Sequence, residues 1–298
     1  MARSIALAAL FTLCACSSVL AEFHAEVKTA KVGPIRMAYY IRGSGKPLFL
    51  INGFISTMGM WDPALLDRLA RKYQLIIFDN RGVGFSTDTT KNNTTMQQMA
   101  DDAAGLMKSL GYQKANILAW SMGARIGQQL LIRHPDLIEK AILCSANPGG
   151  LHQVKPSADT ESKLNNPNVP PMGKIGLVFT DDVEGKLAAK NCLARMRVAA
   201  RAGIIPDDFT VTKETTIRQT RARTTLWNRN TENFRDLKNI KRPVLLTDGR
   251  EDIVDMPRNS VNMANQIPFA WTAFLTGGHA FLFQSYKQFA ELVCVFLQ

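Results

Sequence analysis

The sequence has few of the residues that build metal sites or disulfide frameworks. It contains five cysteines and four histidines in 298 residues, and none stands at a metal-ligand spacing. We therefore exclude a disulfide-dense miniprotein, and we expect no metal site and no cofactor. Beyond the first 21 residues, no run is long and apolar enough to cross a bilayer as a helix. Internal repeats and low-complexity tracts are also absent.

Acidic residues are too few to balance the basic ones. The chain has 36 Lys and Arg against 25 Asp and Glu, a formal net charge of +11. Such an excess suggests nucleic acid or an anionic membrane as a partner. The excess is uneven, because residues 190–242 alone carry a net charge of +8. The apolar fraction of 46% is near the globular average and excludes a disordered chain.

The first 21 residues predict an export signal. Arg3 supplies a positive start, an apolar stretch follows, and small or modest residues end at Ala21. Cleavage there would deliver the mature chain to the periplasm or the medium. The sequence around Cys16 also resembles a bacterial lipoprotein box, so a lipoprotein anchored at Cys16 is the alternative, and an uncleaved anchor is a third. The mature chain keeps three cysteines, an odd number that leaves at least one thiol free.

Short apolar runs alternate with amphipathic stretches in most of the chain. Five runs fit strands buried on both faces: residues 47–51, 75–78, 115–120, 140–144 and 243–246. Helix-like stretches lie at 61–72, 95–110 and 122–133. This alternation predicts an α/β fold with a mostly parallel central sheet and helices on both faces. Residues 24–42 look instead like an antiparallel pair that turns at Gly33 and Pro34.

The alternation breaks between residues 150 and 238. Helices are predicted at 183–203 and 209–228, and a mostly helical insertion between two strands is typical of a lid or cap over a site. We therefore divide the chain into a signal peptide, a core and a cap. The divisions are 1–21 for the signal, 22–149 and 239–298 for the core, and 150–238 for the cap.

A serine stands where a predicted strand meets a predicted helix. The run 115–120 leads directly into Ser121, and Gly123 lies just inside the helix. This strand–turn–helix context is that of a nucleophile elbow, which holds the serine hydroxyl above the carboxyl edge of the sheet. Ala119 replaces the usual first glycine, a change of one methyl group.

A serine hydroxyl needs a base to become nucleophilic. Among the four histidines, His24 lies at the mature N-terminus, His134 ends a helix and His152 lies at the cap entrance. His279 follows two glycines after the apolar run 270–275, so it is expected at the same sheet edge as Ser121.

An acid must fix the tautomer of such a histidine. Three acids follow the run 243–246: Asp248, Glu251 and Asp252. We favour Asp252, because it lies past a tight Gly249 turn and precedes two apolar residues. Asp248 is closer to the strand end, and Glu251 is expected to point to solvent.

An oxyanion needs backbone N–H donors. One should be Met122, directly after the serine. The other should be Phe54, in the loop after the first parallel strand, where Gly53 allows close backbone approach and Asn52 supplies a side-chain hydrogen bond.

Together these motifs resemble the α/β-hydrolase superfamily. The matching features are Asn52-Gly53, the loop 79–86, Ser121 in its elbow, Asp252 and His279, in that order over nearly the whole mature chain. The resemblance is closest to small esterases, enol-lactonases, cofactor-free haloperoxidase-like proteins and proline iminopeptidase-like proteins. The residues of the loop 79–86 themselves favour a tight supporting loop, with Arg81 paired to an acid, over a reactive one. Asn52 departs from the family's usual histidine.

The resemblance implies an exported serine hydrolase that cleaves a carboxylic ester or related acyl bond through an acyl-enzyme. One alternative is a proline iminopeptidase-like aminopeptidase, with Asp181, Asp182 and Glu184 as an acidic pocket for an amine. Another is a non-catalytic binding protein on the same scaffold. We expect a small-molecule acyl substrate and no nucleic acid. The basic cap is either a set of solvated helix faces or a surface for anionic lipid or an acidic substrate. Acyl-chain length and oligomeric state stay open.

Overall fold

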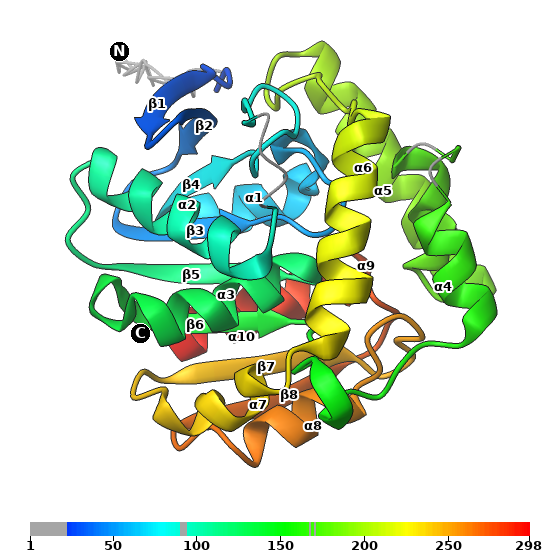
Figure 1. The fold of residues 1–298 in the computed structure, drawn as a ribbon. Coiled ribbons are helices and arrows are strands. Elements are labelled where there is room, and N and C mark those ends of the chain that lie inside the picture. The colour runs from blue at the N-terminus through cyan, green and yellow to red at the C-terminus, as the bar shows by residue number, and fades with distance from the viewer. Residues whose placement is uncertain (1–22, 90–93, 167, 170) are drawn as a thin grey trace, which may run out of the picture.

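An eight-stranded mixed sheet forms the centre of the protein (Figure 1). The computed structural model describes residues 23–89, 94–166, 168–169 and 171–298. The predicted signal peptide and Cys16 therefore lie outside the described residues. The strand order is β1-β2-β4-β3-β5-β6-β7-β8. The strands are β1 Lys28–Val32, β2 Ile35–Arg42, β3 Lys46–Ile51, β4 Tyr73–Phe78, β5 Ala115–Trp120, β6 Ile138–Cys144, β7 Val244–Gly249 and β8 Ala270–Leu275.

The first two strands are antiparallel and the later ones are parallel. β1 pairs with β2 through a tight turn in which Gly33 has a φ of 55°, a conformation that glycine adopts without strain. β2 pairs antiparallel with β4, and every pair from β4 to β8 is parallel. The predicted α/β fold is confirmed. Parallel strands end at one edge of the sheet, so the loops after β3, β5, β7 and β8 lie together there.

Helices cover both faces of the sheet. One face packs against α2 (Met96–Ser109), α3 (Met122–Arg133) and α8 (Arg258–Ala264). The other packs against α1 (Pro63–Ala70), α9 (Phe281–Gln284) and α10 (Tyr286–Leu297). All six β5 side chains are buried, and they alternate between the two layers: Ile117 packs in the first and Leu118 in the second. A strand enclosed on both sides needs an unbroken apolar run, which is what the sequence provides.

Local signals fix the helix starts on both faces. Asp62 caps α1 by accepting a hydrogen bond from Ala64 N (2.9 Å), and Pro63 occupies the first helical position. Thr95 caps α2 in the same way through Gln98 N (3.0 Å). These side chains satisfy backbone donors that the helices leave unpaired at their first turn.

A helical insertion connects β6 to β7. It contains α4 (Ala158–Asn165), α5 (Val183–Arg201), α6 (Lys213–Thr220) and α7 (Glu232–Asp236). The α6 helix continues without a break through a π-helical turn at Arg221–Leu226 to Arg229. Figure 1 shows α4, α5 and α6 together beside one end of the sheet. This insertion is the segment that the sequence assigns to the cap.

The described residues show neither a membrane-spanning helix nor a disulfide. No helix within them is both long and apolar enough to cross a bilayer. Cys144 and Cys192 are buried free thiols, and Cys294 is a partly exposed free thiol.

Candidate active site

Ser121 lies at a sharp turn between β5 and α3. Its backbone has φ 59° and ψ −123°, a strained conformation for a residue with a side chain. Only glycine at position 123 leaves room for this turn, because a Cβ there would lie 2.2 Å from the carbonyl oxygen of Ile51 and 2.6 Å from that of Asn52. The start of α3 therefore lies directly against the end of β3. The turn brings the Ser121 hydroxyl above the carboxyl edge of the sheet.

Two hydrogen bonds link Ser121 to His279 and Asp252. Ser121 Oγ donates to His279 Nε2 at 2.7 Å, and His279 Nδ1 donates to Asp252 Oδ2 at 2.8 Å. The other carboxylate oxygen, Oδ1, accepts from the backbone N–H groups of Val254 (2.7 Å) and Asp255 (3.0 Å). All three side chains are buried. The structure thus brings together the three residues that the sequence selected, and it holds the carboxylate in one orientation.

A tryptophan fixes the imidazole from the other side. Trp120 Nε1 donates to the His279 carbonyl oxygen (2.8 Å), and the two rings lie 5.7 Å apart. This side chain belongs to β5, the same strand that ends in Ser121. The nucleophile and the base are therefore tied to one rigid strand, which limits the freedom of the imidazole.

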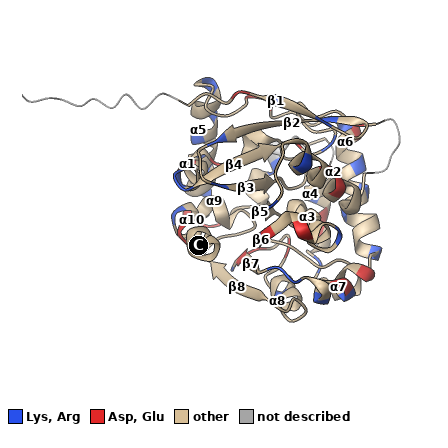
Figure 2. Cartoon of the chain, turned by 90° about the vertical axis from the view of Figure 1, so that its left-hand side faces the viewer, with Lys and Arg blue, Asp and Glu red and all other residues tan. Residues whose placement is uncertain are grey.

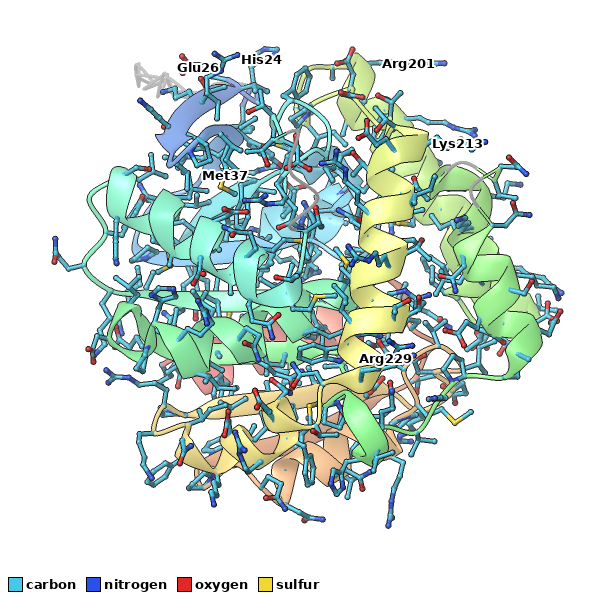
Figure 3. The ribbon with its side chains drawn as sticks, viewed as in Figure 1. His24, Glu26, Met37, Arg201, Lys213 and Arg229 are labelled. Atoms are coloured by element: carbon cyan, nitrogen blue, oxygen red, sulfur yellow. The ribbon has the colours of Figure 1, made fainter. Side chains whose placement is uncertain are left out.

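The other histidines lie elsewhere. His134 Nε2 pairs with Asp101 Oδ1 (2.7 Å), and His152 stacks on Phe234 with ring centroids 3.8 Å apart. His24 lies beside Gly203 near the end of α5, at the outer rim of the molecule (Figure 3). Only His279, among the described histidines, approaches Ser121 within hydrogen-bonding distance.

The two competing acids take different positions. Asp248 is fully buried and accepts hydrogen bonds from Ser145 Oγ (3.1 Å) and Ser260 Oγ (3.0 Å). Burial, together with the nearby Asp252 charge, raises the pKa of Asp248 well above its usual range. Asp248 thus hydrogen-bonds to two serines, whereas Asp252 is the acid that pairs with the His279 imidazole. Glu251 is exposed, but it accepts a hydrogen bond from Gly277 N (2.8 Å), so it also braces the loop that carries His279.

The loop after β3 passes close to the serine. A Cβ at Gly53 would lie 3.2 Å from Ser121 Cβ, so the loop backbone runs directly over the nucleophile. Met122 is the first residue of α3, and its N–H has no acceptor within the helix. The N–H of Phe54 comes from the facing loop, because β3 and β5 are neighbours. The geometry is compatible with the predicted pair of oxyanion donors.

Side chains from the core and the insertion fix this loop. Asn52 Nδ2 donates to the Phe78 carbonyl oxygen (2.9 Å), so asparagine supplies a hydrogen bond here. Ile55 has a φ of 47°, unusual for a β-branched residue, and its N–H donates to Gln219 Oε1 of α6 (2.8 Å). Asp79 Oδ1 accepts from Met58 N (2.7 Å), although burial raises the pKa of Asp79 to about 7. The insertion thus helps to set the loop conformation.

The expected support loop 79–86 contains no second reactive centre. Arg81 forms a bidentate ion pair with Asp102, through Nε (2.6 Å) and Nη2 (2.8 Å). Gly84 lies against Asp79, since a Cβ there would be 2.4 Å from Asp79 Oδ2. These contacts hold the loop under the site. In the described residues, no group of three or more His, Cys, Asp or Glu is arranged to hold a metal ion.

A pocket opens above Ser121 between the core and the insertion. Both Ser121 and His279 line it. Most of its wall is apolar, and includes Trp120, Ile175, Phe179, Met196 and Phe283. Two cationic side chains, Lys174 and Arg223, complete it, whereas no Asp or Glu lines it within the described residues. The sequence gave no signal for Lys174 at this position.

Comparison with known proteins shows the same fold. Residues 46–170 match the family model described as alpha/beta hydrolase fold. The structure is similar to an alpha/beta hydrolase fold protein from Chitinophaga pinensis, with a TM-score of 0.79, 25% identity and coverage of 92% of this chain and 98% of that one. The protein has the α/β-hydrolase fold. This fold is also that of the enol-lactonase from Burkholderia xenovorans LB400, with a TM-score of 0.72 and 22% identity over 91% of this chain and 99% of that one.

A curated relative matches a shorter stretch of this α/β-hydrolase-fold chain. The protein BpoC of Mycobacterium tuberculosis is 37% identical over 110 residues, which cover 37% of this chain. The match spans about two fifths (41%) of the length of that relative.

Proposed function

We propose that the protein is a serine hydrolase that cleaves a carboxylic ester or a related acyl bond. The observation that carries the proposal is the continuous pair of hydrogen bonds from Ser121 Oγ through His279 to Asp252, at 2.7 and 2.8 Å. A serine, a neutral imidazole and a buried carboxylate in this order can deprotonate the serine as it attacks a carbonyl.

The reaction follows from these positions. His279 Nε2 takes the Ser121 proton while Oγ bonds to the substrate carbonyl carbon, and the carbonyl electrons move onto oxygen. The N–H groups of Phe54 and Met122 then stabilise that oxyanion. His279 returns the proton to the leaving alcohol, which departs and leaves an acyl-enzyme on Ser121. A water molecule repeats the sequence and releases the acid.

Asp252 contributes by orienting and stabilising the imidazole. Its hydrogen bond to Nδ1 leaves Nε2 free to accept the serine proton, and its charge stabilises the imidazolium that forms. The two backbone N–H bonds to Oδ1 hold the carboxylate in one orientation.

The wall of the pocket favours an acyl substrate over an amine. An aminopeptidase of the kind considered above would need acids beside Ser121. Asp182 instead caps α5 by accepting from Gly185 N (2.6 Å), and the exposed Asp181 pairs with Lys186 (2.8 Å). The name of the structurally similar enol-lactonase also denotes cleavage of an acyl–oxygen bond. These observations support an ester or lactone substrate.

A further part of the proposal concerns location. We propose that the protein is exported, with residues 1–21 as its signal. Binding to anionic lipid vesicles tests whether the basic cap also contacts a membrane. In Figure 2, Lys and Arg segments are spread over several helices and interspersed with acidic ones on the face shown. Arg201, at the outer end of α5, points away from the molecule (Figure 3).

The test of the catalytic proposal is the Ser121→Ala variant with short 4-nitrophenyl esters as substrates. We expect turnover to fall to the background rate while the melting temperature is kept. Ser109→Ala is the matched control, since Ser109 lies at the end of α2 and bonds only locally to Leu106 O (2.9 Å). Undiminished turnover in Ser121→Ala would refute the proposed nucleophile.

A further inference from the structure

Two buried cations line the pocket that contains Ser121. Lys174, in the 3₁₀ segment Pro171–Leu177, and Arg223, in the π-helical turn after α6, are each 4% exposed. The helix that carries Arg223 begins at Lys213 and reaches Arg229, both labelled in Figure 3. Both cations come from the insertion, so the insertion brings positive charge to the site.

Neither cation has a carboxylate partner among the described residues. Lys174 Nζ donates to the Leu164 carbonyl oxygen (2.7 Å), and Arg223 Nη2 donates to the side-chain oxygen of Asn165. Both acceptors are uncharged. Arg223 Nε is buried without any hydrogen-bond partner in the described structure. Buried charges are ordinarily paired with an opposite charge. Lys174 and Arg223 therefore form a site at which an anion would be stabilised.

The acids near Arg223 do not meet that requirement. Asp255 is engaged by a bidentate hydrogen bond from Arg125 Nη2 (2.9 and 2.8 Å) and by Asn147. Glu161, on α4, is partly exposed and forms no ion pair with Arg223. Consistent with this lack of neutralisation, burial and mutual repulsion lower the pKa of Lys174 to about 8, and burial with the nearby Arg125 lowers that of Arg223 to about 10.

The other arginines of the insertion differ from Arg223, because each is either paired with an acid or exposed to solvent. Arg195 Nε pairs with Asp62 (2.9 Å), and Arg218 pairs with Asp88 (2.9 Å) and Glu214. Arg197 and Arg201 are exposed to solvent. Every buried or half-buried arginine of this group except Arg223 thus has an acid.

Phe54 connects the cations to the reacting atoms. The Lys174 ammonium lies 5.6 Å and the Arg223 guanidinium 5.1 Å from the centroid of the Phe54 ring. A ring attracts cations but does not neutralise them. The backbone N–H of the same residue is the proposed donor to the oxyanion. In the proposed mechanism the leaving group is on the His279 side, because His279 protonates it. We therefore place the cations nearer the acyl part of the substrate than the leaving group.

We propose that Lys174 and Arg223 form a carboxylate-binding subsite, and that the substrate is an ester or lactone whose acyl part carries a carboxylate. This inference rests on the proposed serine-hydrolase function and names its substrate class. The flat guanidinium can donate two parallel hydrogen bonds to a carboxylate, and the ammonium can add a third. The apolar wall then holds the carbon chain between that carboxylate and the reacting carbonyl.

The experiment compares two esters of similar length and different charge. The anionic one is 4-nitrophenyl hydrogen adipate and the neutral one is 4-nitrophenyl heptanoate. Lys174→Met and Arg223→Gln should each lower kcat/KM for the adipate by about tenfold or more, because a charge-assisted hydrogen bond is lost. We expect a change of less than about threefold for the heptanoate. Lys174→Arg should restore part of the loss, which a purely structural role would not explain.

Exposed cap cations supply the controls. Lys190→Met and Arg197→Gln remove a charge from α5, where both side chains are exposed, and should leave the kcat/KM of both esters unchanged. If Arg223→Gln does not fold, the Lys174 variants carry the comparison. Equal losses for the two esters in the Lys174 and Arg223 variants, or no loss for the adipate, would overturn the subsite.

The subsite and the catalytic proposal fail in different ways. Hydrolysis of the heptanoate that depends on Ser121, with no selective effect at Lys174 or Arg223, would remove the subsite alone. If neither ester is hydrolysed, calorimetry with adipate tests the subsite without catalysis. Binding by the wild-type protein that is lost in Lys174→Met supports it, and absence of binding contradicts it.

Discussion

Replacing Gly123 by alanine should disable the site while leaving the fold in place. The added Cβ would lie 2.2 Å from the Ile51 carbonyl oxygen and 2.6 Å from that of Asn52. Both obstacles are backbone atoms at the end of β3, so no side chain can rotate to make room. Because Cβ atoms essentially never come closer than 3.0 Å, the start of α3 must move away from β3 by at least about 0.8 Å.

That movement separates the two groups that must act together. Met122 N–H moves with α3, whereas Phe54 N–H stays with the loop after β3. A misplacement of about 1 Å in a catalytic arrangement can reduce the rate by about a hundredfold. We therefore expect kcat/KM for 4-nitrophenyl esters to fall by about that factor, with a loss of about 1–3 kcal/mol in the free energy of unfolding.

Two other glycine-to-alanine changes separate the catalytic effect from general strain. A Cβ at Gly127, one turn further along α3, would meet only side-chain atoms, the nearest being Leu143 Cδ2 at 2.8 Å. Gly127→Ala should therefore lower stability more than activity. A Cβ at Gly176 would meet nothing within 4 Å, so Gly176→Ala should change neither. The assay is kcat/KM together with the melting temperature. A folded Gly123→Ala protein with nearly wild-type kcat/KM would refute the role given to this close approach.

Three further predictions follow from the same geometry. Asp252→Asn should lower kcat by about 10⁴-fold, as loss of the triad acid does in a serine protease, whereas Asp248→Asn should keep most activity because Asp248 bonds to Ser145 and Ser260 and not to the His279 imidazole; similar kinetics for the two variants would contradict the assignment. The KM for an anionic ester should rise as pH increases through about 8, because Lys174 then loses its proton, and should not do so in Lys174→Met or for a neutral ester. Intact-mass analysis of the protein produced from the full sequence should show a chain beginning at Glu22, or a lipid-modified Cys16 in the alternative, and a retained Met1 would contradict both forms of cleavage.

The sequence predicts the residues at the sheet edge because each follows a local signal. Ser121 comes directly after an apolar run, Asp252 and His279 follow a few residues after theirs, and parallel strands carry the residues after them to one edge. The tight turn at Gly249 and the two apolar residues after Asp252 then favour Asp252 among three neighbouring acids. The sequence alone does not show the geometry of this turn. In the structure, the backbone N–H groups of Val254 and Asp255 donate to Asp252 and hold its carboxylate in place.

The sequence does not predict the charged part of the pocket. Arg218, Arg221 and Arg223 lie in one short stretch and look alike, yet Arg218 is paired, Arg221 is exposed and Arg223 is buried. Which of the three arginines is paired, exposed or buried depends on how the insertion packs against the core. It also depends on the π-helical turn, which changes the face of the helix on which each residue lies. The sequence does not predict the burial of Lys174, because the residues around it come from α4 and from the loop after β3.

The central claim is that Ser121 is a nucleophile activated by His279. A fluorophosphonate probe, followed by digestion and mass spectrometry, tests this claim on the wild-type protein and on His279→Ala. We predict a single adduct on the peptide that contains Ser121, formed by the wild-type protein and nearly absent in His279→Ala. An adduct on another residue, or equal labelling of both proteins, would contradict the account.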